Sequence, residues 1–199
     1  MGNHYYTNQP DVAHNRKQWE FPLRGKNFKF ITDSNVFSKA TVDFGSRVLI
    51  DAFDDTELPD GPILDVGCGY GPMGLSLAHA TGRFIEMVDV NERAVELTKE
   101  NAVLNGIGHI KAYPSYIYES VETTNFAAVV SNPPIRAGKE VVHEIISGSY
   151  DKLVTGGTLT IVIQKKQGAP SAQKKMEEIF GNAEIVTKEK GYFIIVSEK

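Results

Sequence analysis

A glycine-rich turn preceded by an acid is the first feature of this sequence that could bind a ligand. It runs from Asp65 to Gly71 as Asp-Val-Gly-Cys-Gly-Tyr-Gly, and it joins an expected strand, 63–66, to an expected helix, 72–81. Glycine lets the backbone turn sharply and lets a ligand approach the main chain closely. The residues of this turn that we expect to contact a cofactor are Asp65, Gly67, Cys68, Gly69 and Gly71.

The spacing of the glycines fits two classes of cofactor. Gly69, Gly71 and Gly74 match the G-x-G-x-x-G pattern of dinucleotide-binding proteins, and Asp89 lies 20 residues beyond Gly69, where an acid commonly holds a ribose. Val90 follows Asp89 and is expected in the same site. Spacing alone therefore permits a nicotinamide oxidoreductase or an enzyme that uses S-adenosylmethionine (SAM).

The charge of Asp65 favours SAM. A carboxylate at the end of the strand would repel a doubly negative pyrophosphate, whereas SAM presents a positive ammonium and a positive sulfonium. The sequence also permits a plainer role, in which Asp65 only caps the turn or the next helix and Asp89 is a turn acid.

Asn132, Pro133 and Pro134 follow the apolar segment 126–130 and are expected to be catalytic. The lone pair of an amide nitrogen, or of an amino group on an aromatic ring, is delocalised, so such a nitrogen is a poor nucleophile. A site that accepts both of its N–H hydrogens orients it toward a methyl carbon, and positioning then supplies most of the rate. The acceptors would be the Asn132 side-chain oxygen, which also lies near the cofactor, and the Pro133 carbonyl. Because proline has no N–H, the loop offers no competing donor.

The segments that position these residues alternate between strands and helices. The expected strands are 63–66, 84–88, 109–113, 126–130, 157–163, 183–187 and 192–196, and the expected helices after the first strand are 72–81, 92–104, 142–153 and 172–180. The last two strands are too close for a crossover helix and must pair antiparallel. We predict an α/β, Rossmann-like fold, in which a seven-stranded, mostly parallel sheet has helices on both faces and a C-terminal β-hairpin. The glycine turn, Asp89 and Asn132 then share the edge at the carboxyl ends of the strands.

The N-terminal part, 1–40, is expected to pack on this core domain, 41–199. Residues 1–27 are interpreted as an arm without sustained periodicity. Residues 28–31 alternate as a strand, 32–35 are typical of a turn, and 36–37 are expected to return as a short hairpin. A helix is expected from Thr41 onward.

The composition is that of a globular protein, with 41% apolar and 23% charged residues. No apolar run approaches the roughly 20 residues that span a bilayer. Cys68 is the single cysteine, which excludes an internal disulfide, and the five histidines lack metal-ligand spacing, so we expect no metal. We expect a cytoplasmic protein and favour a monomer.

The net charge of −4 is unevenly distributed. Residues 1–47 hold seven Lys and Arg against four acids, whereas the rest of the chain holds 14 against 21. Four further cations follow the fourth and fifth strands of the core domain: Arg136, Lys139, Lys165 and Lys166. Together these residues are expected to form a phosphate-binding rim, although a solvated surface with chance asymmetry fits equally.

The sequence resembles class I SAM-dependent methyltransferases, and among them the small methyltransferase domain of the ribosomal RNA small-subunit methyltransferase C type, a guanine-N2 enzyme. The resemblance covers nearly the whole chain from about Phe28. The segments that carry it are 36–39 with 42–45, Leu64-Asp-Val-Gly-Cys-Gly-Tyr-Gly71, Val88-Asp-Val-Asn-Glu-Arg-Ala-Val95, Glu100-Asn-Ala-Val-Leu-Asn-Gly106, Ser131-Asn-Pro-Pro-Ile-Arg-Ala-Gly-Lys139, and Gly156-Gly157.

This resemblance implies that SAM is converted to S-adenosylhomocysteine and that ribosomal RNA or the small subunit is the partner. It places Gly67 and Gly69 against the methionine moiety, Asp89 on the ribose, and Asn132 and Pro133 on the guanine N2. A protein-glutamine or DNA-adenine N-methyltransferase would use the same Asn-Pro-Pro site, and a catalytically silent SAM-fold binding module is a further alternative.

The sequence departs from the family pattern at two positions. Ile135 stands where an aromatic residue often stacks on the base, and Phe37, Tyr116 or the tyrosines at 5 and 6 are candidate replacements. Ser115-Tyr116 stands where an acid often lies near the adenine, and Tyr116 is expected in the cofactor site. The residues expected to contact the substrate are Phe37, Ile135, Arg136, Lys139, Lys165 and Lys166.

Overall fold

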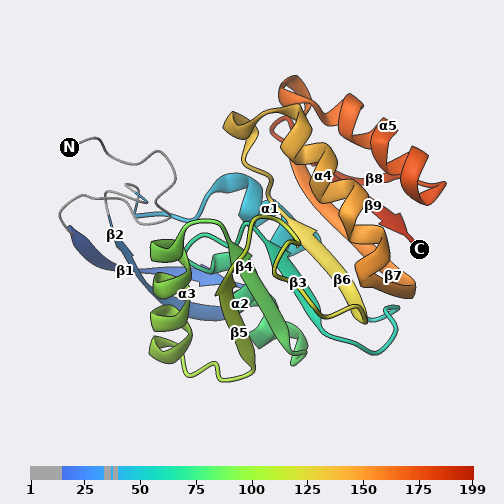
Figure 1. Ribbon diagram of the computed structural model, residues 1–199. Coiled ribbons are helices and arrows are strands. Elements are labelled where there is room, and N and C mark those ends of the chain that lie inside the picture. Colours follow the sequence, from blue (N-terminus) through green and yellow to red (C-terminus); the bar gives the residue numbers. More distant parts are fainter. Residues whose placement is uncertain (1–14, 34–36, 38–39) are drawn as a thin grey trace, which may run out of the picture.

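A computed structural model describes residues 15–33, 37 and 40–199 (Figure 1). The elements in chain order are β1 (Arg16–Leu23), β2 (Lys26–Asp33), α1 (Phe44–Ala52), β3 (Ile63–Val66), α2 (Pro72–Thr81), β4 (Ile85–Asp89), α3 (Glu92–Leu104), β5 (Ile110–Pro114), β6 (Phe126–Ser131), η1 (Ile135–Ala137), α4 (Lys139–Ser149), η2 (Tyr150–Lys152), β7 (Leu153–Gln164), η3 (Lys165–Gln167), α5 (Ala169–Phe180), β8 (Glu184–Glu189) and β9 (Tyr192–Glu198), where η denotes a 3₁₀-helix.

Seven strands form the main sheet in the order β5-β4-β3-β6-β7-β9-β8. The strands from β5 to β7 are parallel, and β9 runs antiparallel to both β7 and β8. From β3 the chain progresses outward through β4 to β5, and then returns to the other side of β3 as β6. The order thus reverses beside β3, and open α/β sheets bind ligands at such a switch point.

Helices cover both faces of the sheet, which is why every residue of the central strands β3 and β6 is buried. Successive strand side chains point to opposite faces. Ile63 accordingly packs in a core with α1, α2 and α3, whereas Leu64 and Val66 pack in a second core with α4 and α5. The predicted α/β fold and its antiparallel C-terminal hairpin are confirmed.

Several sequence-based boundaries need correction. The N-terminal hairpin is formed by β1 and β2, with its turn at Arg24-Gly25. Residues 16–23 were expected in an arm and are a strand instead. Thr32 and Asp33 were expected in a turn and belong to β2. The expected return strand at 36–37 is not found, since Phe37 has no strand structure and residue 36 lies outside the described residues. Leu153, expected on a helix, begins β7.

Two asparagines of α3 attach this hairpin to the core. The Asn101 side chain accepts a hydrogen bond from the Ile31 N–H (2.7 Å) and donates to the Ile31 carbonyl (3.1 Å). The Asn105 side chain likewise accepts from the Lys29 N–H (2.9 Å) and donates to the Lys29 carbonyl (2.7 Å). Their side-chain amides therefore replace a neighbouring strand along β2. Asn101 also donates to the Tyr70 carbonyl (2.9 Å), which links the hairpin to the glycine-rich turn.

Candidate active site

The candidate site lies at the carboxyl ends of β3, β4 and β6. Val66 pairs with Ser131, and the Ser131 hydroxyl donates to the Val66 carbonyl at 2.8 Å. The residues that follow these two, Gly67 and Asn132, are therefore neighbours at one edge. The sequence-based prediction that the glycine turn, Asp89 and Asn132 share this edge agrees with the geometry.

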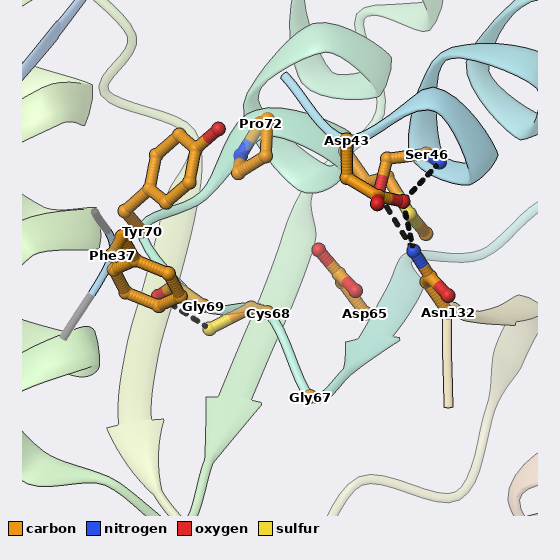
Figure 2. A pocket seen from close by; sticks show the side chains of 11 residues that line it. Phe37, Asp43, Ser46, Asp65, Gly67, Cys68, Gly69, Tyr70, Pro72 and Asn132 are labelled. Carbon is orange, nitrogen blue, oxygen red and sulfur yellow. Dashed lines mark hydrogen bonds between the residues drawn. The ribbon is translucent and has the colours of Figure 1, made fainter. Parts of the chain in front are cut away.

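Two adjoining cavities occupy this edge. The smaller has a volume of about 180 Å³ and is lined by Asp43, Ser46 and Asp65, among others (Figure 2). The larger has a volume of about 410 Å³ and extends past Asp89 to Ile117 and Ile145. The residues that line both are Phe37, Gly67, Gly69 and Asn132.

Asp65 is buried in the wall of the smaller cavity, with 1% of its surface exposed. Its Oδ2 accepts a hydrogen bond from the Gly74 N–H in the first turn of α2 (3.0 Å). Figure 2 shows the carboxylate between the start of α2 and Asn132. Burial raises the pKa of Asp65 to about 7, against the Gly74 hydrogen bond, which lowers it, and with a smaller contribution from the negative Asp89. Asp65 thus caps the helix and also faces the cavity, so a cation there would favour its ionised form.

The donors that a pyrophosphate would need at this turn are already used. The Gly67 and Cys68 N–H groups both donate to the Val88 carbonyl, at 2.8 and 2.9 Å. The Gly69 N–H donates to Asp89 Oδ2 (2.9 Å), and α2 begins with Pro72, which has no N–H. Together with the Gly74 N–H on Asp65, these bonds occupy four backbone donors around the usual anion site at a helix N-terminus. The turn is therefore unsuited to a dinucleotide phosphate.

Asp89 fits a ribose. Its Oδ1 accepts from the Asn91 N–H (2.9 Å) and its Oδ2 from the Gly69 N–H, which leaves each oxygen a further lone pair for a hydroxyl donor. Burial raises the pKa of Asp89, opposed by these backbone hydrogen bonds. The larger cavity beyond it has apolar walls that include Val90, Ala94 and Ile117. A carboxylate beside an apolar cavity of this size matches the ribose and base of an adenosine.

Gly67 keeps the backbone side of the cavity open. Its φ is +77°, and a Cβ added there would meet nothing within 4 Å, since it would project into free space beside the turn. Gly67 also lines both cavities, so its bare main chain leaves room for a methionine moiety, and together with Asp65 and Asp89 it fits SAM.

Asn132 is held by two residues that precede the sheet in sequence. Its Nδ2 donates to Asp43 Oδ2 (2.9 Å) and to Ser46 Oγ (3.0 Å), as Figure 2 shows. Because a carboxylate can only accept, the amide nitrogen must face Asp43, and this fixes the orientation of the amide. The Asn132 oxygen lies on the opposite side of the amide and accepts no hydrogen bond from the described part of the chain.

The N-terminus of α1 positions Asp43 and Ser46 beside Asn132. Asp43 is the N-cap of α1 and accepts the Ser46 N–H at 3.2 Å. Both residues were missed by sequence reasoning. The helix-capping pattern around Asp43 is a local signal, but it gives no hint of a contact with Asn132, 89 residues away.

The other cofactor-site predictions divide into two groups. Val90 and Tyr116 line the larger cavity, and Cys68 lines the smaller one. The Cys68 thiol lies 3.7 Å from Thr98 Oγ1, and burial raises its pKa. Gly71 lines neither cavity: it is the N-cap of α2, with φ +104°, and a Cβ there would meet Leu75 at 3.0 Å. Its glycine is needed for the turn.

The substrate-site predictions are similarly divided. Phe37 lines both cavities and packs on Tyr70 with ring centroids 4.9 Å apart, while Pro134 lines the larger cavity and Pro133 is buried. Ile135 and Lys139 instead line a separate cavity between α4 and α5. Three predicted cations, Arg136, Lys165 and Lys166, are exposed and line neither part of the candidate site. The tyrosines at 5 and 6 lie outside the described residues.

The described residues contain no group of three His, Cys, Asp or Glu side chains placed to hold a metal ion. Among these residues, too, no helix has both the length and the apolar character that crossing a membrane requires.

The fold and the site define a Rossmann-like class I methyltransferase. The family model described as "Methyltransferase small domain" matches residues 27–196. The chain belongs to this family, whose members are SAM-dependent methyltransferases.

Comparisons with individual proteins agree with this assignment. A Bacillus subtilis protein named "Uncharacterized protein YbxB" is 55% identical over 201 residues, which cover 100% of both chains. Ribosomal RNA small subunit methyltransferase C of Enterobacter sp. (strain 638) is 34% identical over 179 residues, which are 86% of this chain and 49% of that protein. The chain thus spans about half the length of the methyltransferase C relatives that it matches.

A similar solved structure is the T. thermophilus 16S rRNA N2 G1207 methyltransferase in complex with AdoMet and guanosine. It superposes with a TM-score of 0.84 at 24% identity and covers 96% of this chain and 52% of its own. At that identity the likeness supports the fold.

Proposed function

We propose that this protein transfers the methyl group of SAM to the exocyclic N2 of a guanine in small-subunit (16S) ribosomal RNA. The observation that carries the proposal is the fixed amide of Asn132, which offers only an oxygen to an incoming amino group beside a cavity suited to a cationic donor. The similarity to rRNA methyltransferases supports RNA as the acceptor.

Residues of both cavities would hold the donor. Asp89 would accept the ribose hydroxyls, with Val90 and Tyr116 beside the adenine, and Gly67 and Gly69 would leave room for the methionine end. Asp65 would face the positive charges of that end. When bound, SAM supplies a methyl carbon on a sulfonium, which is already a good leaving group.

Asn132 would position the acceptor. Its oxygen and the Pro133 carbonyl would accept the two N–H hydrogens of the target amine and turn the nitrogen lone pair toward the methyl carbon. Asp43 and Ser46 would act as positioning residues, because they hold the Asn132 nitrogen away from the acceptor. Rotation of the amide would present a donor to the substrate N–H groups and abolish this geometry.

The proposed acceptor makes ribosomal RNA or the small ribosomal subunit the partner and the cytoplasm the place of reaction. A DNA-adenine or protein-glutamine methyltransferase would use the same Asn132 geometry, so the acceptor has to be tested directly. Purified protein should be incubated with methyl-labelled SAM and, separately, small subunits, naked 16S rRNA, DNA and release factors, with Asn132→Ala as the inactive control. Label in RNA that depends on Asn132 supports the proposal, and label confined to protein or DNA would overturn it.

A further inference from the structure

Aromatic and cationic side chains cluster next to the residues that hold Asn132. The Arg47 guanidinium lies over the Phe44 ring (4.9 Å from the centroid) and over the Phe21 ring (5.4 Å). The Lys190 ammonium lies over Phe44 as well (4.9 Å). We call Phe21, Phe44, Arg47 and Lys190 the cationic platform. Tyr192 packs edge-on against the Phe44 ring, with the two ring centroids 5.6 Å apart.

Apart from the rings beneath them, the two cations of the platform have no hydrogen-bond acceptor or anion as a partner among the described residues. Neither the Arg47 nor the Lys190 side chain forms a hydrogen bond or an ion pair there, and Arg47 Nε is buried without an acceptor. Arg83, in contrast, pairs with Asp55 and donates to several carbonyls. A guanidinium has five N–H donors, and those of Arg47 that remain accessible are free to bind an external anion.

Two residues of the platform, Phe44 and Arg47, lie on the same turn of α1 as the residues that hold Asn132. Phe44 and Arg47 are the neighbours in sequence of Asp43 and Ser46, which bind the Asn132 amide. On the other side, the turn between β8 and β9 brings Lys190 next to η3, because the Lys165 N–H donates to the Gly191 carbonyl at 2.9 Å. The row of cations therefore continues from α1 through Lys190 to the exposed Lys165 and Lys166.

We propose that the cationic platform binds the single-stranded RNA segment adjoining the target nucleotide, an inference that rests on the proposed function. Arg47 and Lys190 would contact its phosphates. A guanine N2 can reach the Asn132 oxygen only when the base leaves its stack, so the strand next to it must also be unpaired and held. Charged side chains on aromatic rings suit such a strand, since backbone phosphates supply most of the affinity and rings permit stacking of bases.

A purely structural role for the platform makes a different prediction. In that case the rings and cations only pack β1 against α1, and their loss would change stability without changing RNA affinity. Lys111, which lies 5.0 Å above the Tyr113 ring on the opposite edge strand β5, offers a matched lysine–aromatic pair outside the platform.

The test compares the double variant Arg47→Gln/Lys190→Asn with Lys111→Gln. Asn suits position 190, whose φ of +49° is tolerated by asparagine better than by most residues. Binding of a fluorescent single-stranded fragment of 16S rRNA is measured by anisotropy at several salt concentrations, together with the melting temperature and the KM and kcat of methyl transfer.

We expect the double variant to bind RNA at least tenfold more weakly and to lose about 1.4 from the slope of log affinity against log salt, corresponding to two phosphate contacts. The KM for RNA should rise, while kcat and SAM affinity stay unchanged, and Lys111→Gln should behave as wild type. The inference would be overturned by any of three results: the double variant keeps its RNA affinity, Lys111→Gln loses as much RNA affinity as the double variant, or the wild type binds no RNA. RNA binding that depends on the platform without any methyl transfer to RNA would instead refute the proposed function alone.

Discussion

Replacing Asp65 with asparagine should remove a pH dependence from both the stability of the free protein and its affinity for SAM. Asparagine keeps an oxygen that can accept the Gly74 N–H but carries no charge. Burial raises the pKa of Asp65 from 3.8 to about 7. At about 1.4 kcal/mol per unit, the ionised form is disfavoured by about 4 kcal/mol in the folded free protein.

The sign of the stability effect follows from proton binding. Between pH 3.8 and about 7 the folded protein holds a proton on Asp65 that the unfolded chain has lost. Stability is therefore highest below this window and falls as pH rises through it. Asp65 alone should therefore lower the free energy of unfolding by about 4 kcal/mol between pH 4 and pH 8. This corresponds to a melting temperature roughly 10 °C lower at pH 8 than at pH 4. The Asp65→Asn variant should lack this component and be more stable than wild type at pH 8.

SAM affinity should change in the opposite direction. The ligand is cationic and favours ionised Asp65, so wild-type affinity should rise about tenfold from pH 6 to pH 7.5, a range in which the ligand's α-ammonium stays largely charged. Asp65→Asn should bind SAM more weakly than wild type at pH 7.5 and with little dependence on pH. Isothermal titration calorimetry measures the affinities and differential scanning calorimetry the stabilities. Equal pH profiles in the two proteins would refute the assignment of Asp65 to the cationic end of SAM.

Three further substitutions test other contacts. Asn132→Ala should lower turnover at least 100-fold while the SAM Kd from calorimetry stays within about twofold, because the side chain acts on the acceptor; unchanged turnover would remove Asn132 from the mechanism. Asn101→Ala should lower the free energy of unfolding in urea by about 3 kcal/mol, because it leaves the buried Tyr70 carbonyl and the partly buried N–H and carbonyl of Ile31 without their partner; a loss no greater than that in Asn105→Ala, whose hydrogen bonds to Lys29 are exposed, would contradict this. Gly67→Ala should raise the SAM Kd at least tenfold, because φ is +77°, a conformation that alanine rarely adopts, so the turn that lines both cavities must shift; wild-type affinity would place the ligand elsewhere.

The core of the fold could be predicted from local signals. Helix α2 has the expected bounds because Pro72 occupies its first turn and a glycine ends it, and α3 because Asn91 caps it. The buried strands β3 and β6 are short apolar runs bounded by turn residues. Because parallel strands share one carboxyl edge, their order along the chain was enough to bring Asp65, Asp89 and Asn132 together.

The N-terminal hairpin was misplaced for a physical reason. Its turn contains Arg24 with φ +46°, a conformation that most side chains avoid. The Arg24 guanidinium donates to the Phe53 carbonyl at 3.1 Å, a tertiary contact that no local pattern reveals. Pro22 lies in β1 and further weakens its strand pattern, although Trp19, Phe21 and Leu23 do alternate.

The parts of the site that sequence reasoning missed are long-range contacts between polar side chains. Asp43 and Ser46 are a local capping pair, and only the folded chain brings them to Asn132. Ile135 was expected to contact the substrate because of its place after the prolines, yet the 3₁₀ turn of residues 135–137 directs it to the second core. Such contacts depend on how distant elements pack.

The identity of the methylated nucleoside tests the central claim most directly. Small subunits or 16S rRNA from cells that lack this protein should be treated with the purified enzyme and SAM, digested to nucleosides and analysed by mass spectrometry. N2-methylguanosine should appear with the wild-type protein and be absent with Asn132→Ala. A methyl group found on another base, or on ribose, with no N2-methylguanosine formed, would contradict it.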